Sequence, residues 1–173
     1  GLPGETTRSF LKGIDRVITL KPDFVRLYPA LVVKESGLEK MYRNGSYRPL
    51  SLNRAIGLTA KAYSRLTAAG IGVVRMGLLP SPELEAGVVA GPYHPAFGEL
   101  VHSRVWLQKM RARLSLLRPQ SNLVVHISHR DMSAVVGMKK RNIKRLEELG
   151  FSGRFTILPS REIARGSIFY VVS

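Results

Sequence analysis

The sequence has no cysteine, no long apolar run and few acidic residues, and each absence limits what the chain can be. Without cysteine, its 173 residues can form no disulfide and no thiolate metal site of their own. No apolar run approaches the roughly 20 residues of a membrane-spanning helix, so we expect no membrane partner. Residues 1–30 also lack the succession of basic, apolar and small residues that marks a secretory signal. These absences predict a cytoplasmic protein.

Acidic residues are scarce relative to basic ones. The chain has 12 Asp and Glu against 27 Lys and Arg, which gives a formal charge of +15. Two explanations stay open: an acidic segment outside this chain balances the charge, or the protein binds a polyanion. A hydrophobic content of 45% is sufficient for one large domain or two small ones.

The chain opens on Gly-Leu-Pro-Gly-Glu-Thr, a glycine-rich turn that leads directly into a helix predicted over residues 5–20. Glycine permits backbone angles and close approaches that a Cβ would block, and proline stiffens the turn. Glu5 and Thr6 stand where a helix start favours a carboxylate and a capping hydroxyl. Because such a turn normally follows a buried strand, we expect the chain to be the C-terminal part of a longer protein. Its first partner would then be the N-terminal half of that protein.

Strands and helices alternate through the first part of the sequence. Residues 24–28 and 71–78 are predicted strands, and Ser51 is predicted to cap the helix between them, which Gly70 ends. Residues 30–33 are expected to prolong the first strand, and the proline-rich stretches at 80–82 and 91–95 are expected to be loops. This alternation predicts a parallel α/β architecture, open or barrel-like.

The second part begins after a helix predicted over residues 96–114. Residues 118–122 are the best candidate for a linker, which divides the chain into domains 1–117 and 118–173. The C-terminal domain has a predicted β-α-α-β-β order, with strands and helices at 123–127, 130–136, 141–149, 154–158 and 167–172.

Residues 135–150 join the two helices of this C-terminal domain and resemble the core of KH domains. In that family a Gly-x-x-Gly loop grips a single-stranded nucleic-acid backbone. Gly137 occupies the first glycine position, whereas Lys140 stands at the second. Phosphates would meet amides at the start of the second helix and the basic side chains of Lys139, Lys140, Arg141 and Lys144. An unrelated small α/β domain with a solvated basic helix remains the alternative.

The N-terminal part carries the more specific resemblance, because several strings occur in order over residues 1–110. They resemble the radical SAM superfamily, and its Elongator catalytic-subunit branch in particular. The strings lie at residues 1–6, 21–29, 26–38, 45–47, 88–97 and 99–100.

This resemblance implies the C-terminal part of a partial (β/α)6 barrel that binds S-adenosylmethionine (SAM) and a 4Fe–4S cluster. The parent enzyme would cleave SAM reductively to a 5′-deoxyadenosyl radical that abstracts hydrogen from a substrate. Gly1, Gly4 and Glu5 would lie beside SAM, and the main chain near Tyr28 and Ala30 would approach its adenine. The residues themselves leave two alternatives open: Glu5 as a helix-dipole carboxylate and Tyr28 as a core aromatic.

The cluster of this family requires three cysteines, and this chain has none. We therefore expect the chain alone to be catalytically inactive and to retain no cofactor. The Elongator branch usually ends in an acetyltransferase-like domain, which the C-terminal domain here does not resemble. None of the histidines has metalloprotease spacing, and His94, in a proline-bounded loop, is the one most expected to have a functional role.

Three functions compete. The first is a radical SAM enzyme that acts on RNA or tRNA. The second is an enzyme similar to oxygen-independent coproporphyrinogen oxidases, whose Gly-Leu-Pro-Gly turn is alike and whose basic surface would meet porphyrin carboxylates. The third is a non-catalytic RNA-binding module in which the barrel part is only a scaffold.

Overall fold

A computed structural model describes all residues from 1 to 173, which divide into two compact units, Gly1–Val101 and His102–Ser173. The chain passes from one to the other within α5 (Phe97–Ser115). The sequence placed the boundary after residue 117, at the end of this helix. In the structure, Trp106, Met110 and Leu114 of α5 are buried in the core of the second unit. The proline that follows α5 ends the helix, but the packing unit has already begun by then.

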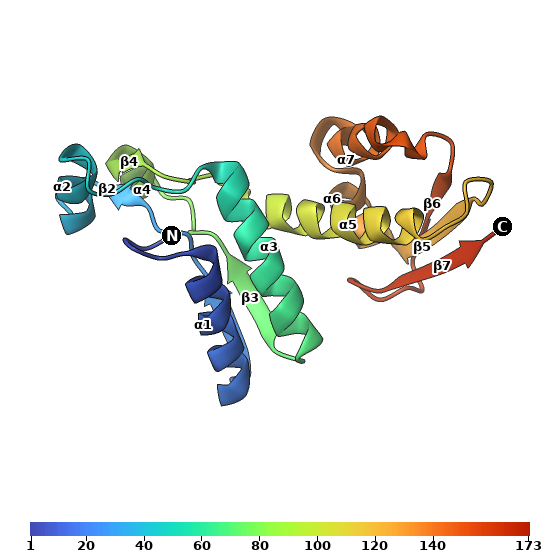
Figure 1. The fold of residues 1–173 in the computed structure, drawn as a ribbon, viewed down its shortest axis with the longest axis horizontal. Helices are drawn as coiled ribbons and strands as arrows, with labels where there is room; N and C mark the ends of the chain where they lie inside the picture. The colour runs from blue at the N-terminus through green and yellow to red at the C-terminus, as the bar shows by residue number, and fades with distance from the viewer. The chain divides into compact units, whose positions relative to one another are not determined.

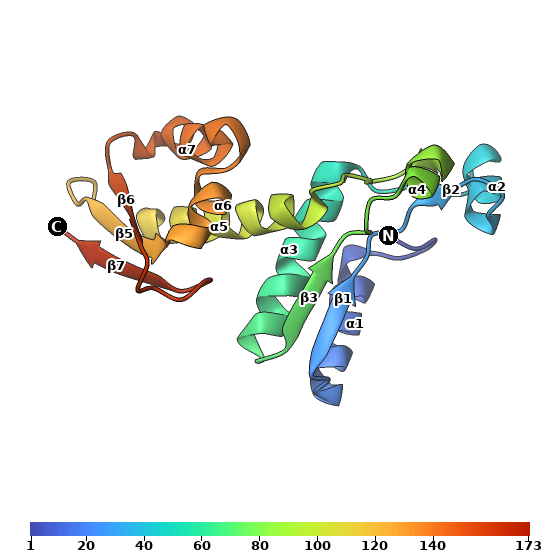
Figure 2. The same cartoon turned by 180° about the vertical axis from the view of Figure 1, so that it is seen from behind.

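The first unit contains a parallel pair of strands covered by two helices. β1 (Phe24–Leu27) pairs with β3 (Gly72–Met76), and α1 (Thr7–Leu20) and α3 (Leu52–Ala68) lie together on one face of the pair (Figures 1 and 2). The shared core consists of buried Ile14, Ala62, Leu66 and Ile71. The predicted α/β fold is thus confirmed.

The predicted extension of the first strand over residues 30–33 is wrong. Pro29 ends the pairing of β1 because it has no amide hydrogen to donate. The chain then forms β2 (Val32–Val33), which pairs antiparallel with β4 (Val88–Ala90) in a separate small sheet. A short helix, α2 (Gly37–Arg43), follows.

One proline-rich stretch begins a helix instead of remaining a loop. α4 (Pro82–Gly87) starts with Pro82 in its first turn, where a missing amide costs nothing. The hydroxyl of Ser81 caps this helix by accepting a hydrogen bond from the Leu84 amide at 3.2 Å. The two prolines therefore mark a helix start.

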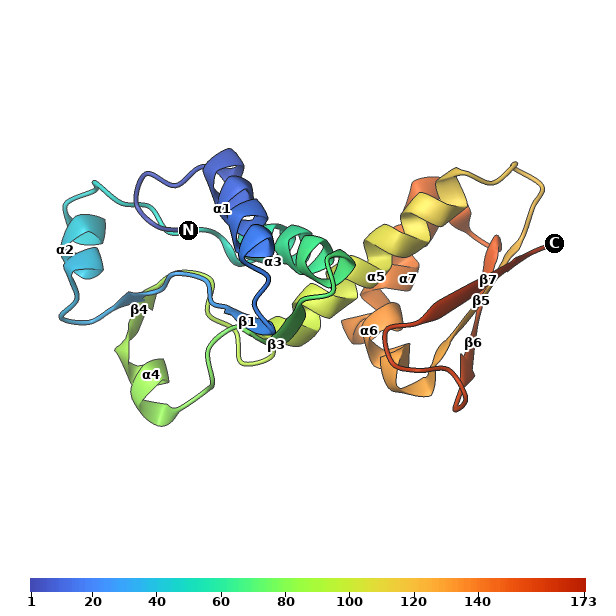
Figure 3. The same ribbon diagram turned by 90° about the horizontal axis from the view of Figure 1, so that it is seen from below.

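The second unit is a three-stranded sheet with helices against one face (Figure 3). β5 (Leu123–Ser128) lies between β6 (Phe155–Ser160), to which it is parallel, and β7 (Ile168–Val172), to which it is antiparallel. Between β5 and β6 the chain forms η1 (His129–Asp131), α6 (Met132–Val136), η2 (Met138–Lys140), α7 (Arg141–Leu146) and η3 (Glu147–Phe151). The expected β-α-α-β-β order is present, and the KH resemblance itself stays a prediction. No helix in either unit is long and apolar enough to span a membrane.

Candidate functional site

The opening turn folds back against the segment that follows β1. A Cβ built on Gly1 would lie 3.0 Å from Leu50 Cδ1 and 3.9 Å from the Cβ of Ala30. The hydroxyl of Tyr47 donates a hydrogen bond of 2.7 Å to the Gly1 carbonyl. The Glu5 carboxylate accepts a hydrogen bond from the amino group of Gly1. Gly1 and Ala30, which are far apart in the sequence, therefore lie side by side, and Glu5 belongs to the same opening turn.

Tyr47 is the residue of this cluster that the sequence analysis missed as a candidate. Its side chain is buried, and burial, with the nearby Glu5 charge, raises the pKa of its phenol. The hydroxyl therefore stays protonated and can act as a donor to the turn. Tyr47 lies within the fourth of the similar strings, at residues 45–47, but nothing local in the sequence indicates a contact 46 residues away.

The other two predicted cofactor residues lie differently. Gly4 adopts a left-handed conformation with φ +74°, and open space surrounds the position of a Cβ. Its glycine is thus required by the backbone and not by a close neighbour. Tyr28 is half exposed, so it is no core aromatic.

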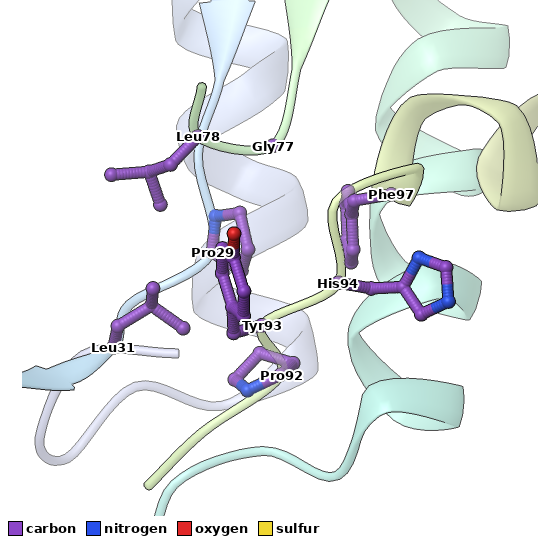
Figure 4. Close-up of a pocket in the computed structure, with 8 residues that line it drawn as sticks. All are labelled: Pro29, Leu31, Gly77, Leu78, Pro92, Tyr93, His94 and Phe97. Carbon is purple, nitrogen blue, oxygen red and sulfur yellow. The ribbon is translucent and has the colours of Figure 1, made fainter. Parts of the chain in front are cut away.

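A shallow hollow lies just past the C-terminal ends of β1 and β3 (Figure 4). Its volume is about 150 Å³, below the 300–1,000 Å³ usual for a small-molecule site, so these residues form at most one wall of a ligand site. Pro29 and Leu31, on either side of Ala30, line it together with Gly77, Leu78, Pro92, Tyr93, His94 and Phe97. Barrel enzymes bind ligands at this end of their strands.

Two glycines hold the walls of the hollow close together. A Cβ on Gly77, whose φ is +82°, would lie 2.7 Å from the Cβ of Phe97, so no larger residue fits. Gly91 lies against the carbonyl of Ala30, since a Cβ there would be 3.3 Å from that oxygen.

Tyr93 and His94 have polar partners within the same unit. The Tyr93 hydroxyl donates to Glu85 at 2.7 Å, and this bond raises the pKa of the phenol. The imidazole of His94 points away from Pro29 and Leu31, and its Nδ1 accepts from the Ala96 amide at 3.0 Å (Figure 4). His94 thus holds the turn that leads into α5.

No group of three or more His, Cys, Asp or Glu side chains in the chain is placed to hold a metal ion. The residues present therefore do not fit an iron–sulfur cluster.

The loop between α6 and α7 is the second candidate site. Gly137 has φ +74° and ψ 158°, and a Cβ there would lie 3.0 Å from Ser103 Oγ and 3.1 Å from Asn142 Cγ. Lys139 and Lys140 then adopt the left-handed region with φ +53° and +59°, which is costly for residues with a side chain. Lys140, at the second glycine position of the KH motif, thus retains a glycine-like conformation.

Asn142 holds the loop between α6 and α7 in place through hydrogen bonds of its side chain. It is buried, and its amide nitrogen donates to the carbonyls of Ser103, Ala134 and Val135 at 2.9–3.1 Å. The sequence analysis missed this residue, whose contact with Ser103 spans 39 residues.

Positive charge concentrates at the loop that Asn142 supports. The predicted nucleic-acid-binding side chains, Lys139, Lys140, Arg141 and Lys144, are all exposed. The guanidinium of Arg104 on α5 is partly buried, and burial together with the Arg141 charge lowers its pKa.

Comparison with known proteins indicates the class. Residues 22–106, just under half of the chain, match the family model of the radical SAM C-terminal domain. The match includes β1, β3 and the residues of the hollow.

Two relatives come from Methanocaldococcus jannaschii. The chain is 36% identical to an uncharacterized protein over 67 residues, which are 39% of this chain and 21% of the relative. It is 34% identical to a tRNA uridine(34) acetyltransferase over 67 residues, which are 37% of this chain and 12% of the relative. The chain thus aligns with about a fifth and an eighth of the lengths of these relatives.

Proposed function

We propose that this chain is the C-terminal part of a radical SAM enzyme and supplies one wall of its SAM site. The observation that carries the proposal is the packing of Gly1, in the glycine turn, against Ala30 beside the end of β1, within and next to residues that match a radical SAM family model. When bound with a cluster, SAM supplies hydrogen-abstraction chemistry. The cluster ligands would be cysteines outside this chain.

The residues of the wall fit parts of SAM. The Glu5 carboxylate, in the turn before α1, would meet the α-ammonium group at the methionine end of SAM. The apolar hollow beside Ala30 suits the flat face of an adenine. Tyr47 would hold the turn in place through the Gly1 carbonyl.

We propose RNA as the substrate class. Three observations support it: the net charge of +15, the exposed basic loop after Gly137, and a relative whose name refers to tRNA. Acetyl transfer is not part of the proposal, because the match covers 12% of that relative.

The SAM site is tested in the complete protein of which this chain would be the C-terminal part, with its cluster reconstituted without oxygen. We expect 5′-deoxyadenosine from SAM and dithionite, and none from residues 1–173 alone. Glu5→Gln should weaken SAM binding about tenfold, because a hydrogen bond to a charged group is lost. Glu162→Gln, an exposed carboxylate of the other unit, is the control. A complete protein that neither binds nor cleaves SAM contradicts the proposal.

The substrate class is tested by binding of a fluorescent tRNA to residues 1–173 over a range of salt concentrations. Reversing Lys139, Lys140 and Arg141 to Glu should weaken binding and lower the salt slope by about 2, since each phosphate contact on a single strand adds about 0.7. Reversing the equally exposed Arg8, Lys12 and Arg16 of α1 is the control for net charge. Binding of a tetracarboxylate porphyrin without RNA binding would favour the coproporphyrinogen oxidase-like alternative.

A further inference from the structure

The sheet of the second unit has one face that no element of that unit covers. Leu123, Val125 and Ile127 of β5 are buried under α5, α6 and α7. Side chains alternate along a strand, so Val124 and His126 lie on the opposite face. On the neighbouring strands, exposed side chains occupy that face: Thr156 and Leu158 on β6, and Phe169 and Val171 on β7.

The register aligns the side chains of this face in two rows. His126 is paired with Leu158 on one side and with Phe169 on the other. Val124 is paired with Thr156 and Val171 in the same way. Directly paired side chains lie about 5 Å apart at Cβ, so the rings of His126 and Phe169 are neighbours.

Phe169 is unusually exposed for an aromatic residue in the middle of a strand. Its side chain is 60% exposed, while the next ring along the strand, Tyr170, packs against the core. An aromatic ring this exposed, beside His126 and Val171, contributes little burial energy to this unit. It is available for a planar ligand.

The charge around this face selects the kind of ligand. Residues 102–173 contain 14 Lys and Arg against 4 Asp and Glu, a net charge of +10 in the smaller unit. Arg130, Arg161 and Arg165 are exposed and follow β5 and β6 at the same end of the sheet. Two acids lie at that end: Glu162 is exposed, whereas Asp131 is buried, accepts from the Gly166 amide at 2.6 Å and is paired with Arg165 at 3.6 Å, which leaves Arg130 and Arg161 as the cations without an ion pair. Flat apolar groups on a polyanion fit such a surface.

We infer that this open face stacks bases of single-stranded RNA, with Phe169 and His126 each beneath one of two successive bases. This inference rests on the proposed RNA substrate and adds a base-stacking surface to the phosphate-binding loop. Aromatic and imidazole rings on a sheet are general platforms for unpaired bases, because every base has a π-face. Arginines at the strand ends would meet the flanking phosphates.

The test measures binding of a fluorescent uridine 12-mer to residues 1–173. Phe169→Ala should weaken binding at least about fivefold, the lower limit for loss of one stacked base. The affinity of this variant should depend on salt concentration with the same slope as that of the unchanged protein, because no phosphate contact is removed. Phe169→Leu keeps an apolar side chain but no ring, so it should bind the RNA as weakly as Phe169→Ala. Phe169→Tyr keeps the ring and should bind as tightly as the unchanged protein. Leu116→Ala, at an even more exposed apolar residue just after α5, is the control.

The outcomes separate the two proposals. Binding that is lost only on charge reversal of the loop, with all Phe169 variants unchanged, overturns the stacking surface and leaves the RNA substrate intact. No binding of the unchanged protein at low salt overturns both. Light scattering tests whether a second copy of the chain covers this face of the sheet instead. If the protein is a dimer that Phe169→Ala dissociates without a change in RNA affinity, the inference is also overturned.

Discussion

At the scale of single residues, the two candidate sites depend on side chains that fix the backbone. Asn142 holds the basic loop through three carbonyls, and Tyr47 holds the opening turn through one. Each is buried and lies beneath the residues expected to touch a ligand. Changes at such positions should alter stability as well as binding.

Gly137→Ala tests the fit of the basic loop. A methyl group there would crowd Ser103 and Asn142, and the φ and ψ of Gly137 lie in a region that is almost exclusive to glycine. We expect a loss of about 2 kcal/mol in the free energy of unfolding, measured in urea. Gly153→Ala, with φ +69° but open space around the Cβ, is the control and should cost less. Equal losses of unfolding free energy in the two variants would show that the contacts with Ser103 and Asn142 do not matter.

Tyr47→Phe tests the opening turn through its dependence on pH. The pKa of the phenol is raised in the folded protein, so the stabilisation is fully present below the unfolded value of about 10 and is lost as the pH rises above it. At pH 7 the variant should be less stable by about 1 kcal/mol, the value of one hydrogen bond. Above pH 10 the difference should narrow. The more exposed Tyr42→Phe should show neither effect in the same thermal unfolding series.

At the scale of elements, the starts of the helices follow from local chemistry. Thr6 and Ser9 form a reciprocal capping box at α1, with bonds of 2.9 and 3.0 Å between backbone amides and hydroxyls. At α3 the hydroxyl of Ser51 caps the helix by accepting a hydrogen bond of 3.3 Å from the Arg54 amide. The glycine turn therefore enters α1 at a fixed residue.

Thr6→Ala should lower the free energy of unfolding by about 1 kcal/mol. The Ser9 amide loses its acceptor, the Thr6 hydroxyl, and the reciprocal bond from the amide of residue 6 to the Ser9 hydroxyl is weakened. Thr19→Ala is the matched control in the last turn of the same helix, where the hydroxyl only returns to the Asp15 carbonyl. Alanine has the higher helix propensity, so that variant should be neutral or slightly stabilising. Thermal unfolding followed by circular dichroism measures both, and a neutral Thr6→Ala would contradict the capping role.

Elements whose signals are local could be predicted from the sequence, and those that depend on distant partners could not. The cap at Ser51 and the stop at Gly70 were predicted correctly, since each acts within a few residues. The pairing of β2 with β4 was missed because two short strands so far apart carry no local pattern. The candidate site divides in the same way: Gly4 is required by its own φ, whereas Tyr47 acts on a turn 46 residues away.

At the scale of the whole molecule, charge and packing both divide between the two units. Residues 1–101 have 13 basic and 8 acidic residues, a net charge of +5, against +10 for residues 102–173. The second unit is thus smaller and twice as charged, which agrees with our proposal that RNA contacts belong to it and SAM contacts to the first.

Each unit has a hydrophobic core of its own, and we therefore expect them to unfold separately. Leu66 is fully buried with Ile14 and Ile71 in the first unit, and Leu146 with Val135 in the second. Leu66→Ala and Leu146→Ala should each lower the free energy of unfolding of their own unit by about 2–5 kcal/mol. Hydrogen exchange of the native chain should show lost amide protection confined to residues 1–101 for Leu66→Ala and to residues 102–173 for Leu146→Ala. Each variant is the control for the other. Equal loss of protection across both units in either variant would show that the chain unfolds as one cooperative body.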